Sequence, residues 1–200
     1  FSAPLKQRLL DHHRCTIVDT LGSSEGTGMG RQVTSRSRND RGTARFVLGG
    51  HTRVFTEDGQ EVRPGSGERG RLALGHPLPE GYFKDPAKTE ATFPTIGGRR
   101  WSVPGDWATV EADGSIVLLG RGSECINTGG EKVYPEEVEE ALKVHPAVVD
   151  CNVVGVDDER WGQAVTAVVQ LWESAAVDGE ALRSDVRDRF AGYKVPKRFV

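Results

Sequence analysis

The sequence has 200 residues, of which 36% are hydrophobic and 28% are charged. This is the composition of an ordinary globular protein, and the length suffices for one large or two small cores. The formal net charge of −3 gives no electrostatic reason to expect nucleic acid or an anionic membrane as the main partner. No apolar run approaches the roughly 18 residues that a transmembrane helix requires, so we expect no transmembrane segment.

The three cysteines, Cys15, Cys125 and Cys151, are odd in number and far apart. They form neither a CxxC pair nor a zinc-ligand spacing, and we expect free thiols in a reducing, cytoplasmic setting. Glycine is enriched, at 25 of 200 residues, against an average of about 7%. This enrichment predicts many turns, and places where the backbone passes close to a neighbour.

The first 44 residues contain one helix, one strand and a polar loop. Apolar side chains at helical spacing predict a short amphipathic helix over residues 4–14, and residues 15–20 predict a strand. The strand ends in a segment of small residues with one carboxylate, Gly22-Ser-Ser-Glu-Gly26, a common place for a ligand site. Residues 30–44 interleave four arginines with Ser, Asn and Thr. We expect a solvated, mobile loop there, since no aromatic residues accompany the arginines.

Residues 44–119 are rich in strand signals. Asp-Gly pairs at 58–59 and 113–114 predict two hairpins, and residues 68–74 predict a further strand. Residues 75–100 form a long segment that we expect to be irregular. Within it, Tyr82 and Phe83 are expected to be core residues, with the wall of a ligand cleft as the alternative.

Residues 120–200 alternate between helix and strand signals. Pro135 suits the first position of a helix that we expect to continue to about residue 145, and the following glutamates favour the positive end of its dipole. Strands are predicted at 148–156 and 164–171, a charged amphipathic helix at 179–190 and a short strand at 198–200. The sequence thus predicts an α+β fold in two pieces, divided at Gly120–Ser123.

Several side chains could bind a nucleotide, and each has a structural alternative. Ser23 and Ser24 offer hydroxyls for phosphate oxygens, and Glu25 a carboxylate that can hold Mg²⁺. Asp106 can accept hydrogen bonds from ribose hydroxyls or can cap a turn. Arg121 suits a phosphate, although an arginine after a strand is by itself most often part of a surface ion pair. Gly129 and Gly130 either let backbone approach a ligand or form a left-handed turn before the helix.

Three segments occur in one order along the chain: Leu21–Gly26, Gly105-Asp106-Trp107 and the run GRGSECINTGGEKVYPEEVEE that starts at Gly120. This order resembles the adenylate-forming superfamily, which includes acyl-CoA synthetases, luciferases and peptide-synthetase adenylation domains. The long run is most similar to fatty-acyl-CoA and steroid-acyl-CoA ligases, and the resemblance covers essentially all 200 residues. It implies that a carboxylate attacks the α-phosphate of Mg-ATP to give acyl-AMP, and that the thiol of CoA then displaces AMP.

The resemblance also implies roles for single residues. Gly22 and Ser23 match the loop that lines the adenine and acyl pocket, and Ser24 stands where the family usually has the Thr that contacts the α-phosphate. Glu25 matches the Mg²⁺-linked glutamate. Residues matched to the remaining ligand contacts are Asp106 for the ribose hydroxyls, Arg121 for the ribose and phosphate, and Gly129, Gly130 and Glu131 for the pantetheine arm of CoA.

The same resemblance assigns residues 1–120 to the C-terminal, β-rich part of a large AMP-binding domain and 121–123 to a hinge. Ser123 occupies the hinge position, and residues 124–200 correspond to a small mobile domain. The family's phosphate loop is expected before Phe1 and its catalytic lysine after Val200. We therefore expect the isolated chain not to form acyl-AMP.

The leading hypothesis is a C-terminal portion of an ATP-dependent acyl-CoA ligase with small-molecule substrates. One alternative is an acyl-AMP ligase that delivers to a carrier protein in place of CoA. Another is a non-catalytic binding or oligomerisation module, and a homodimer is left open in each case.

Overall fold

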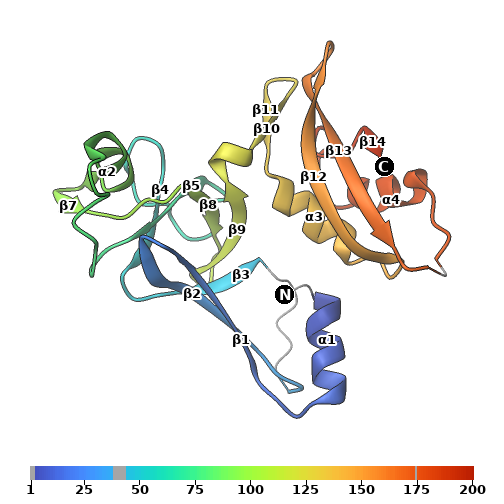
Figure 1. The fold of residues 1–200 in the computed structure, drawn as a ribbon, viewed down its shortest axis with the longest axis horizontal. Coiled ribbons are helices and arrows are strands. Elements are labelled where there is room, and N and C mark those ends of the chain that lie inside the picture. The colour runs from blue at the N-terminus through green and yellow to red at the C-terminus, as the bar shows by residue number, and fades with distance from the viewer. Residues whose placement is uncertain (1–2, 38–43, 174) are drawn as a thin grey trace. The chain divides into compact units, whose positions relative to one another are not determined.

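The computed structural model describes residues 3–37, 44–173 and 175–200 and has the predicted α+β fold (Figure 1). It divides into two compact units. One unit consists of residues 12–119, and the other of residues 120–200 together with residues 3–11 of the N-terminal helix α1 (Ala3–His12). No helix of the described ranges is long and apolar enough to cross a membrane.

The unit of residues 12–119 is built on a seven-stranded sheet with the order β1-β2-β3-β9-β8-β5-β4. The strands are β1 (Ile17–Ser23), β2 (Gly26–Thr34), β3 (Arg45–Leu48), β4 (Thr52–Phe55), β5 (Arg69–Leu74), β8 (Asp106–Val110) and β9 (Ser115–Arg121). Alternate side chains of these strands meet on one face, as the period of two in a strand requires. They form a core around Met29, Leu72 and Ile116, all fully buried.

The expected polar loop at 30–44 is wrong over its first part, because residues 30–34 belong to β2. Gln32 and Thr34 are buried there. The Gln32 side chain donates from Nε2 to the carbonyl oxygen of Arg45 at 2.9 Å, so its polar group is satisfied inside the sheet. Residues 38–43 of the expected loop lie outside the described residues.

The segment 75–100 is also more regular than expected. It contains a helix, α2 (Pro86–Thr92), and a two-stranded sheet of β6 (Thr95–Ile96) and β7 (Arg99–Arg100). Asp85 caps α2 by accepting the backbone N–H of Lys88 at 2.9 Å, and Pro86 occupies the first turn. The hairpin expected around Asp58-Gly59 forms only a turn and a single bridge from Phe55 to Glu61, since β4 pairs with β5 instead.

The second unit carries a five-stranded sheet in the order β11-β10-β13-β12, with β14 beside β13. Its elements are η1 (Gly122–Glu124), β10 (Ile126–Thr128), β11 (Glu131–Val133), α3 (Pro135–Lys143), β12 (Val148–Asp158), β13 (Gly162–Leu171), α4 (Gly179–Arg187) and β14 (Arg198–Phe199). The helices and strands predicted after residue 134 are therefore confirmed, with boundaries shifted by a few residues.

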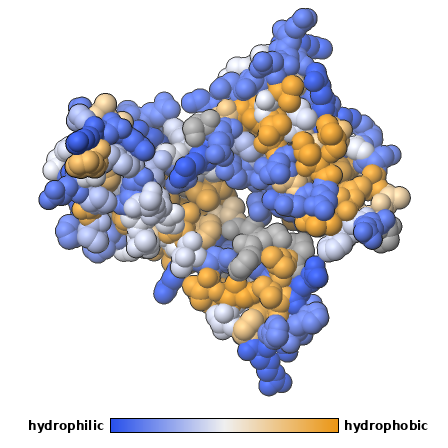
Figure 2. Space-filling model, viewed as in Figure 1, coloured by the Kyte–Doolittle hydropathy of each residue, from blue (hydrophilic) through white to orange (hydrophobic). Residues whose placement is uncertain are grey.

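Helices α3 and α4 cover one face of this sheet. Val138 of α3 and Val186 of α4 share a buried core with Val153 and Val165 of the β12–β13 hairpin. On the opposite face the apolar side chains of β12 and β13 are exposed, among them Val154 and Val168. Figure 2 shows hydrophobic side chains on the viewed surface of this unit, mixed with hydrophilic ones.

The loop that follows α4 is tied to the start of α3 by an ion pair. Lys194 Nζ contacts Glu137 Oε2, and the two side chains are only 17% and 9% exposed. The Lys194 ammonium also lies 5.2 Å from the centre of the Phe190 ring. A mostly buried charge pair therefore fixes this loop against α3.

Candidate functional site

The first cluster of predicted site residues lies at one end of the β1–β2 hairpin. Gly22 and Ser23 end β1, Ser24 and Glu25 form the turn, and β2 begins at Gly26. A side chain at position 26 would clash with the Leu74 side chain, so packing requires glycine there. The expected loop of small residues is thus a tight turn on a rigid sheet.

The carboxylate of Glu25 is surrounded by hydrogen-bond donors. The hydroxyl of Tyr82 donates to Glu25 Oε1. This bond is the largest cause of a pKa lowered to about 2, assisted by the Ser23 and Ser24 hydroxyls and the Glu25 N–H, against a smaller opposing effect of burial. Glu25 is therefore ionised at neutral pH and is partly buried in the turn.

Tyr82 was not predicted to contribute to this site. Its backbone N–H donates to Thr89 Oγ1 at 2.8 Å, and its ring lies 4.2 Å from Lys88 Nζ and 6.0 Å from the Phe93 ring. The expectation of a core position is wrong for its neighbour Phe83, which is 89% exposed. The Asp-Pro pair at 85–86, a helix-start signal, could have revealed the helix that supports Tyr82.

Asp106 is the first residue of β8 and is half-buried. It belongs to the same seven-stranded sheet as the β1–β2 hairpin, with β3 and β9 between. The preceding Gly105 has φ +109° and makes the bend through which the chain enters β8. Asp106 therefore stands at the start of a strand that the sheet holds in place.

The other predicted residues lie in the unit of residues 120–200. Arg121 ends β9 and is exposed, and the backbone of Ser123 lies in the short turn η1. Gly129 and Gly130 form the two-residue turn between β10 and β11, with φ +60° and +87°, and Glu131 begins β11. The left-handed turn is therefore confirmed for the glycine pair.

The Gly129–Gly130 turn is held by its neighbour Trp161. The N–H of Gly129 donates to the carbonyl oxygen of Trp161 at 2.8 Å. A Cβ at position 129 would approach Cε3 of the indole to 3.2 Å, which is tighter than ordinary contact. Glycine at 129 is thus needed both for φ and for packing.

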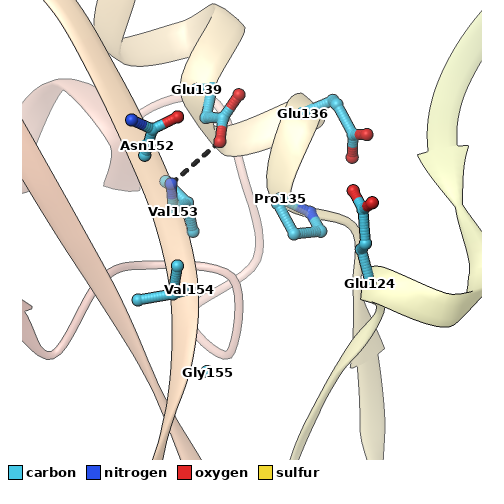
Figure 3. A pocket seen from close by; sticks show the side chains of 8 residues that line it. All are labelled: Glu124, Pro135, Glu136, Glu139, Asn152, Val153, Val154 and Gly155. Carbon is cyan, nitrogen blue, oxygen red and sulfur yellow. Dashed lines mark hydrogen bonds between the residues drawn. The ribbon is translucent and has the colours of Figure 1, made fainter.

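A pocket of about 500 Å³ opens beside the start of α3 (Figure 3). Its lining residues are Glu124, Pro135, Glu136, Glu139, Asn152, Val153, Val154 and Gly155. Glu139 Oε1 accepts the Val153 N–H at 2.8 Å, whereas the carboxylates of Glu124 and Glu136 face each other (Figure 3). The pocket therefore gathers negative charge at the beginning of the second unit.

Glu136 is a half-buried acid of this pocket. Burial raises its pKa, and the nearby charges of Glu124 and Glu139 raise it further, against the lowering effect of the backbone N–H groups of Glu136 and Arg121. Its Oε2 is buried and has no hydrogen-bond partner among the described residues. Sequence reasoning placed Glu136 only in the first turn of α3 and missed this environment.

The predicted residues thus form two groups. Gly22, Ser23, Ser24 and Glu25 are adjacent in one turn, and Asp106 is in the same unit. Arg121, Gly129, Gly130 and Glu131 belong to the other unit. Among the residues that the structure describes, no three His, Cys, Asp or Glu side chains are placed to hold a metal by themselves.

Comparison with known proteins identifies the relatives of this chain. Residues 137–200 match the family model of the AMP-binding enzyme C-terminal domain. A medium/long-chain-fatty-acid–CoA/3-oxocholest-4-en-26-oate–CoA ligase of Mycolicibacterium smegmatis is 48% identical over 198 residues. Residues 137–200 belong to the AMP-binding enzyme C-terminal domain family, and the chain as a whole is similar to acyl-CoA ligases.

Other relatives agree with this assignment. A 3-oxocholest-4-en-26-oate–CoA ligase of Rhodococcus rhodochrous is also 48% identical over 98% of this chain. The alignment covers 36% of the length of each of these two ligases. The chain therefore spans about a third of the curated relatives that it matches.

Solved structures of the family share the fold. ATP-bound MatB from Rhodopseudomonas palustris matches with a TM-score of 0.79 at 26% identity, covering all of this chain and 39% of MatB. The o-succinylbenzoate CoA synthetase of Bacillus subtilis, in complex with its acyl-adenylate intermediate, matches with a TM-score of 0.75 at 28% identity. That match covers 99% of this chain and 40% of the synthetase.

Proposed function

We propose that this chain is the C-terminal part of an ATP-dependent acyl-CoA ligase for lipid-type carboxylic acids. The observation that carries the proposal is the Ser23-Ser24-Glu25 turn, which presents an ionised carboxylate and two hydroxyls at the end of the β1–β2 hairpin. The 48% identity to ligases named for fatty and steroid acids supports the substrate class. The reaction joins an acid to CoA in the cytoplasm in two steps.

In the first step a carboxylate oxygen of the acid attacks the α-phosphorus of ATP, and pyrophosphate leaves. We assign Ser24 to the α-phosphate, Gly22 and Ser23 to the adenine and acyl pocket, and Asp106 to the ribose hydroxyls. Arg121 supplies a planar cation to the ribose and phosphate. Each of these side chains offers donors or acceptors that match the group assigned to it.

Mg²⁺ fits the donors of the turn. Hard cations prefer carboxylate and hydroxyl oxygens, and Mg²⁺ is usually bound by one or two carboxylates together with substrate phosphates. Glu25, ionised and partly exposed, satisfies this requirement without further acidic neighbours. When bound, the ion neutralises charge on the phosphates. Glu25 is the residue that would hold it.

In the second step the thiol of CoA attacks the acyl carbon, and AMP leaves. We assign the Gly129–Gly130 turn and Glu131 to the pantetheine arm, because a turn without side chains lets backbone approach a narrow ligand. Ser123 in η1 is the proposed hinge between residues 1–120, as part of a large AMP-binding domain, and the mobile domain 124–200.

The proposal is tested in a hybrid ligase, in which this chain replaces the matching part of the Mycolicibacterium smegmatis relative. We expect release of pyrophosphate with ATP and a fatty or steroid acid, and acyl-CoA when CoA is added. The isolated 200-residue chain should release none. A folded hybrid that releases no pyrophosphate with any of these acids would contradict the proposal. Acyl transfer to a phosphopantetheinyl carrier protein, with none to CoA, would favour the carrier-linked alternative.

A further inference from the structure

The donor to Glu25 comes from a distant part of the sequence. Tyr82 is 57 positions away from Glu25, yet its hydroxyl donates to Glu25 Oε1. The other side-chain donors, Ser23 and Ser24, belong to the same turn as Glu25 and move with it. Tyr82 is therefore the hydrogen-bond partner that connects the Glu25 carboxylate to another segment of the same unit.

Tyr82 is itself held at several points. Its N–H donates to Thr89 Oγ1 at 2.8 Å, and that hydroxyl donates to the Asp85 carbonyl oxygen at 2.7 Å. Lys88 Nζ lies 4.2 Å from the centre of the Tyr82 ring. The backbone and the ring are thus both fixed by residues at the start of α2.

The Phe93 ring, 6.0 Å away, supports the Tyr82 ring further along the segment. Gly81 allows the chain before Tyr82 to approach α2 closely, because a side chain there would clash with Thr89. The segment 81–93 therefore forms a support for one phenol hydroxyl. This helix and its contacts have no assigned part in the reaction proposed above.

We propose that Tyr82 is the positioning residue of Glu25. It holds Oε1 of the carboxylate, so that Oε2 would be available to a metal in a single orientation. A partly exposed glutamate on a turn otherwise samples several rotamers, and this freedom is lost on binding. Outer hydrogen-bond partners of metal ligands act in this way in many sites. The inference rests on the proposed function of Glu25.

The test measures metal binding separately from turnover. Mn²⁺ is titrated into the hybrid ligase in the presence of α,β-methylene-ATP, and free Mn²⁺ is followed by electron paramagnetic resonance. We expect Tyr82→Phe to weaken Mn²⁺ binding about tenfold, the lower end of the usual effect of removing an outer partner. In the Glu25→Gln background the same change should not weaken Mn²⁺ binding further, because a residue that acts only through the Glu25 carboxylate has no effect once that carboxylate is absent.

Two controls separate positioning from general damage. Tyr193→Phe removes a phenol hydroxyl in the other unit and should leave Mn²⁺ binding unchanged. Thr89→Val removes the acceptor for the Tyr82 N–H and should weaken binding, whereas Thr89→Ser, which keeps the hydroxyl, should restore it. If Tyr82→Phe does not fold, the Thr89 pair decides the question.

The outcomes distinguish this inference from the proposed function. If the unsubstituted hybrid forms no acyl-AMP, the function fails and the role of Tyr82 fails with it. If acyl-AMP forms but Tyr82→Phe keeps Mn²⁺ affinity within about twofold, only the positioning role is overturned. A loss that adds to that of Glu25→Gln would likewise overturn it, since it would show action on the fold and not through Glu25.

Discussion

The carboxylate of Glu136 lies directly against the α-carbon of Gly120, where any side chain at position 120 would clash with it. Gly120 has φ +118°, a conformation that residues with a Cβ rarely adopt. Glu136 belongs to the first turn of α3. Gly120 and the start of α3, both in the unit of residues 120–200, are thus joined by a contact that depends on glycine.

The first prediction concerns this contact. Gly120→Ala should lower the free energy of unfolding by more than about 1 kcal/mol, because it combines a clash with an unfavourable φ. Chemical denaturation of the 200-residue chain measures the loss. Gly50→Ala is the matched control, since open space surrounds that position. Adding Glu136→Ala should recover only the part due to the clash. Equal stability of the two alanine variants would show that the contact is absent.

Glu136 should also make stability depend on pH. Burial raises its pKa above the ordinary value of 4.5. The protonated form is therefore favoured in the folded state, and the resulting stability is fully present below pH 4.5 and lost as the pH rises through the raised pKa. We expect Glu136→Gln to be more stable than the parent at pH 7 and equal to it near pH 4. Denaturation at a series of pH values checks this, with exposed Glu90→Gln as the control. A pH-independent difference would contradict it.

The ion pair of Glu137 and Lys194 should stabilise the folded state of the second unit. Removing one partner of a largely buried pair leaves an unpaired charge, so we expect Glu137→Gln to cost about 2–3 kcal/mol, somewhat less than for fully buried pairs. The control is Glu61→Gln, which breaks an exposed pair with Arg53 and should cost less than about 1 kcal/mol. Thermal unfolding measures both. Similar losses in the two variants would contradict the assignment of Lys194 to a buried pair.

The cysteines should differ in reactivity. Cys151 is buried and its pKa is raised to about 12, mainly by burial. Its thiol therefore stays protonated at neutral pH, and the thiolate is the reactive form. Iodoacetamide should modify the exposed Cys15 readily and Cys151 only after unfolding, as mass spectrometry of peptides would record. Modification of Cys151 in the native chain at the rate of Cys15 would contradict this.

Local signals in the sequence predicted much of the fold. Pro135 followed by two glutamates marked the start of α3, and the Asp113-Gly114 pair marked the β8–β9 turn. These signals are local, because proline and glycine set the conformation of their own backbone and the glutamates interact with the dipole of their own helix. The polar residues of β2 did not reveal their strand. Gln32 is buried because the Arg45 carbonyl accepts its amide, and such a partner is not visible in a local pattern.

The candidate site was predictable only in part. The segment Gly22–Glu25 could be found by its small residues and by its resemblance to a family. The partner of Glu25 could not, because Tyr82 reaches it through tertiary packing across 57 positions. The same holds for Glu136, whose raised pKa depends on Glu124 and on burial in the folded chain.

The turn of Gly129 and Gly130 lies against the indole ring of Trp161, so the fluorescence of this tryptophan can report on the turn. Arg160 and Lys197 approach the Trp161 ring to 4.8 Å and 5.2 Å, and Gly129 packs against its edge. Indole emission is sensitive to neighbouring charge and water, so any displacement of this turn changes the fluorescence of Trp161. With the other three tryptophans replaced by phenylalanine, the unit of residues 120–200 contains its own reporter of ligand arrival and needs no attached dye.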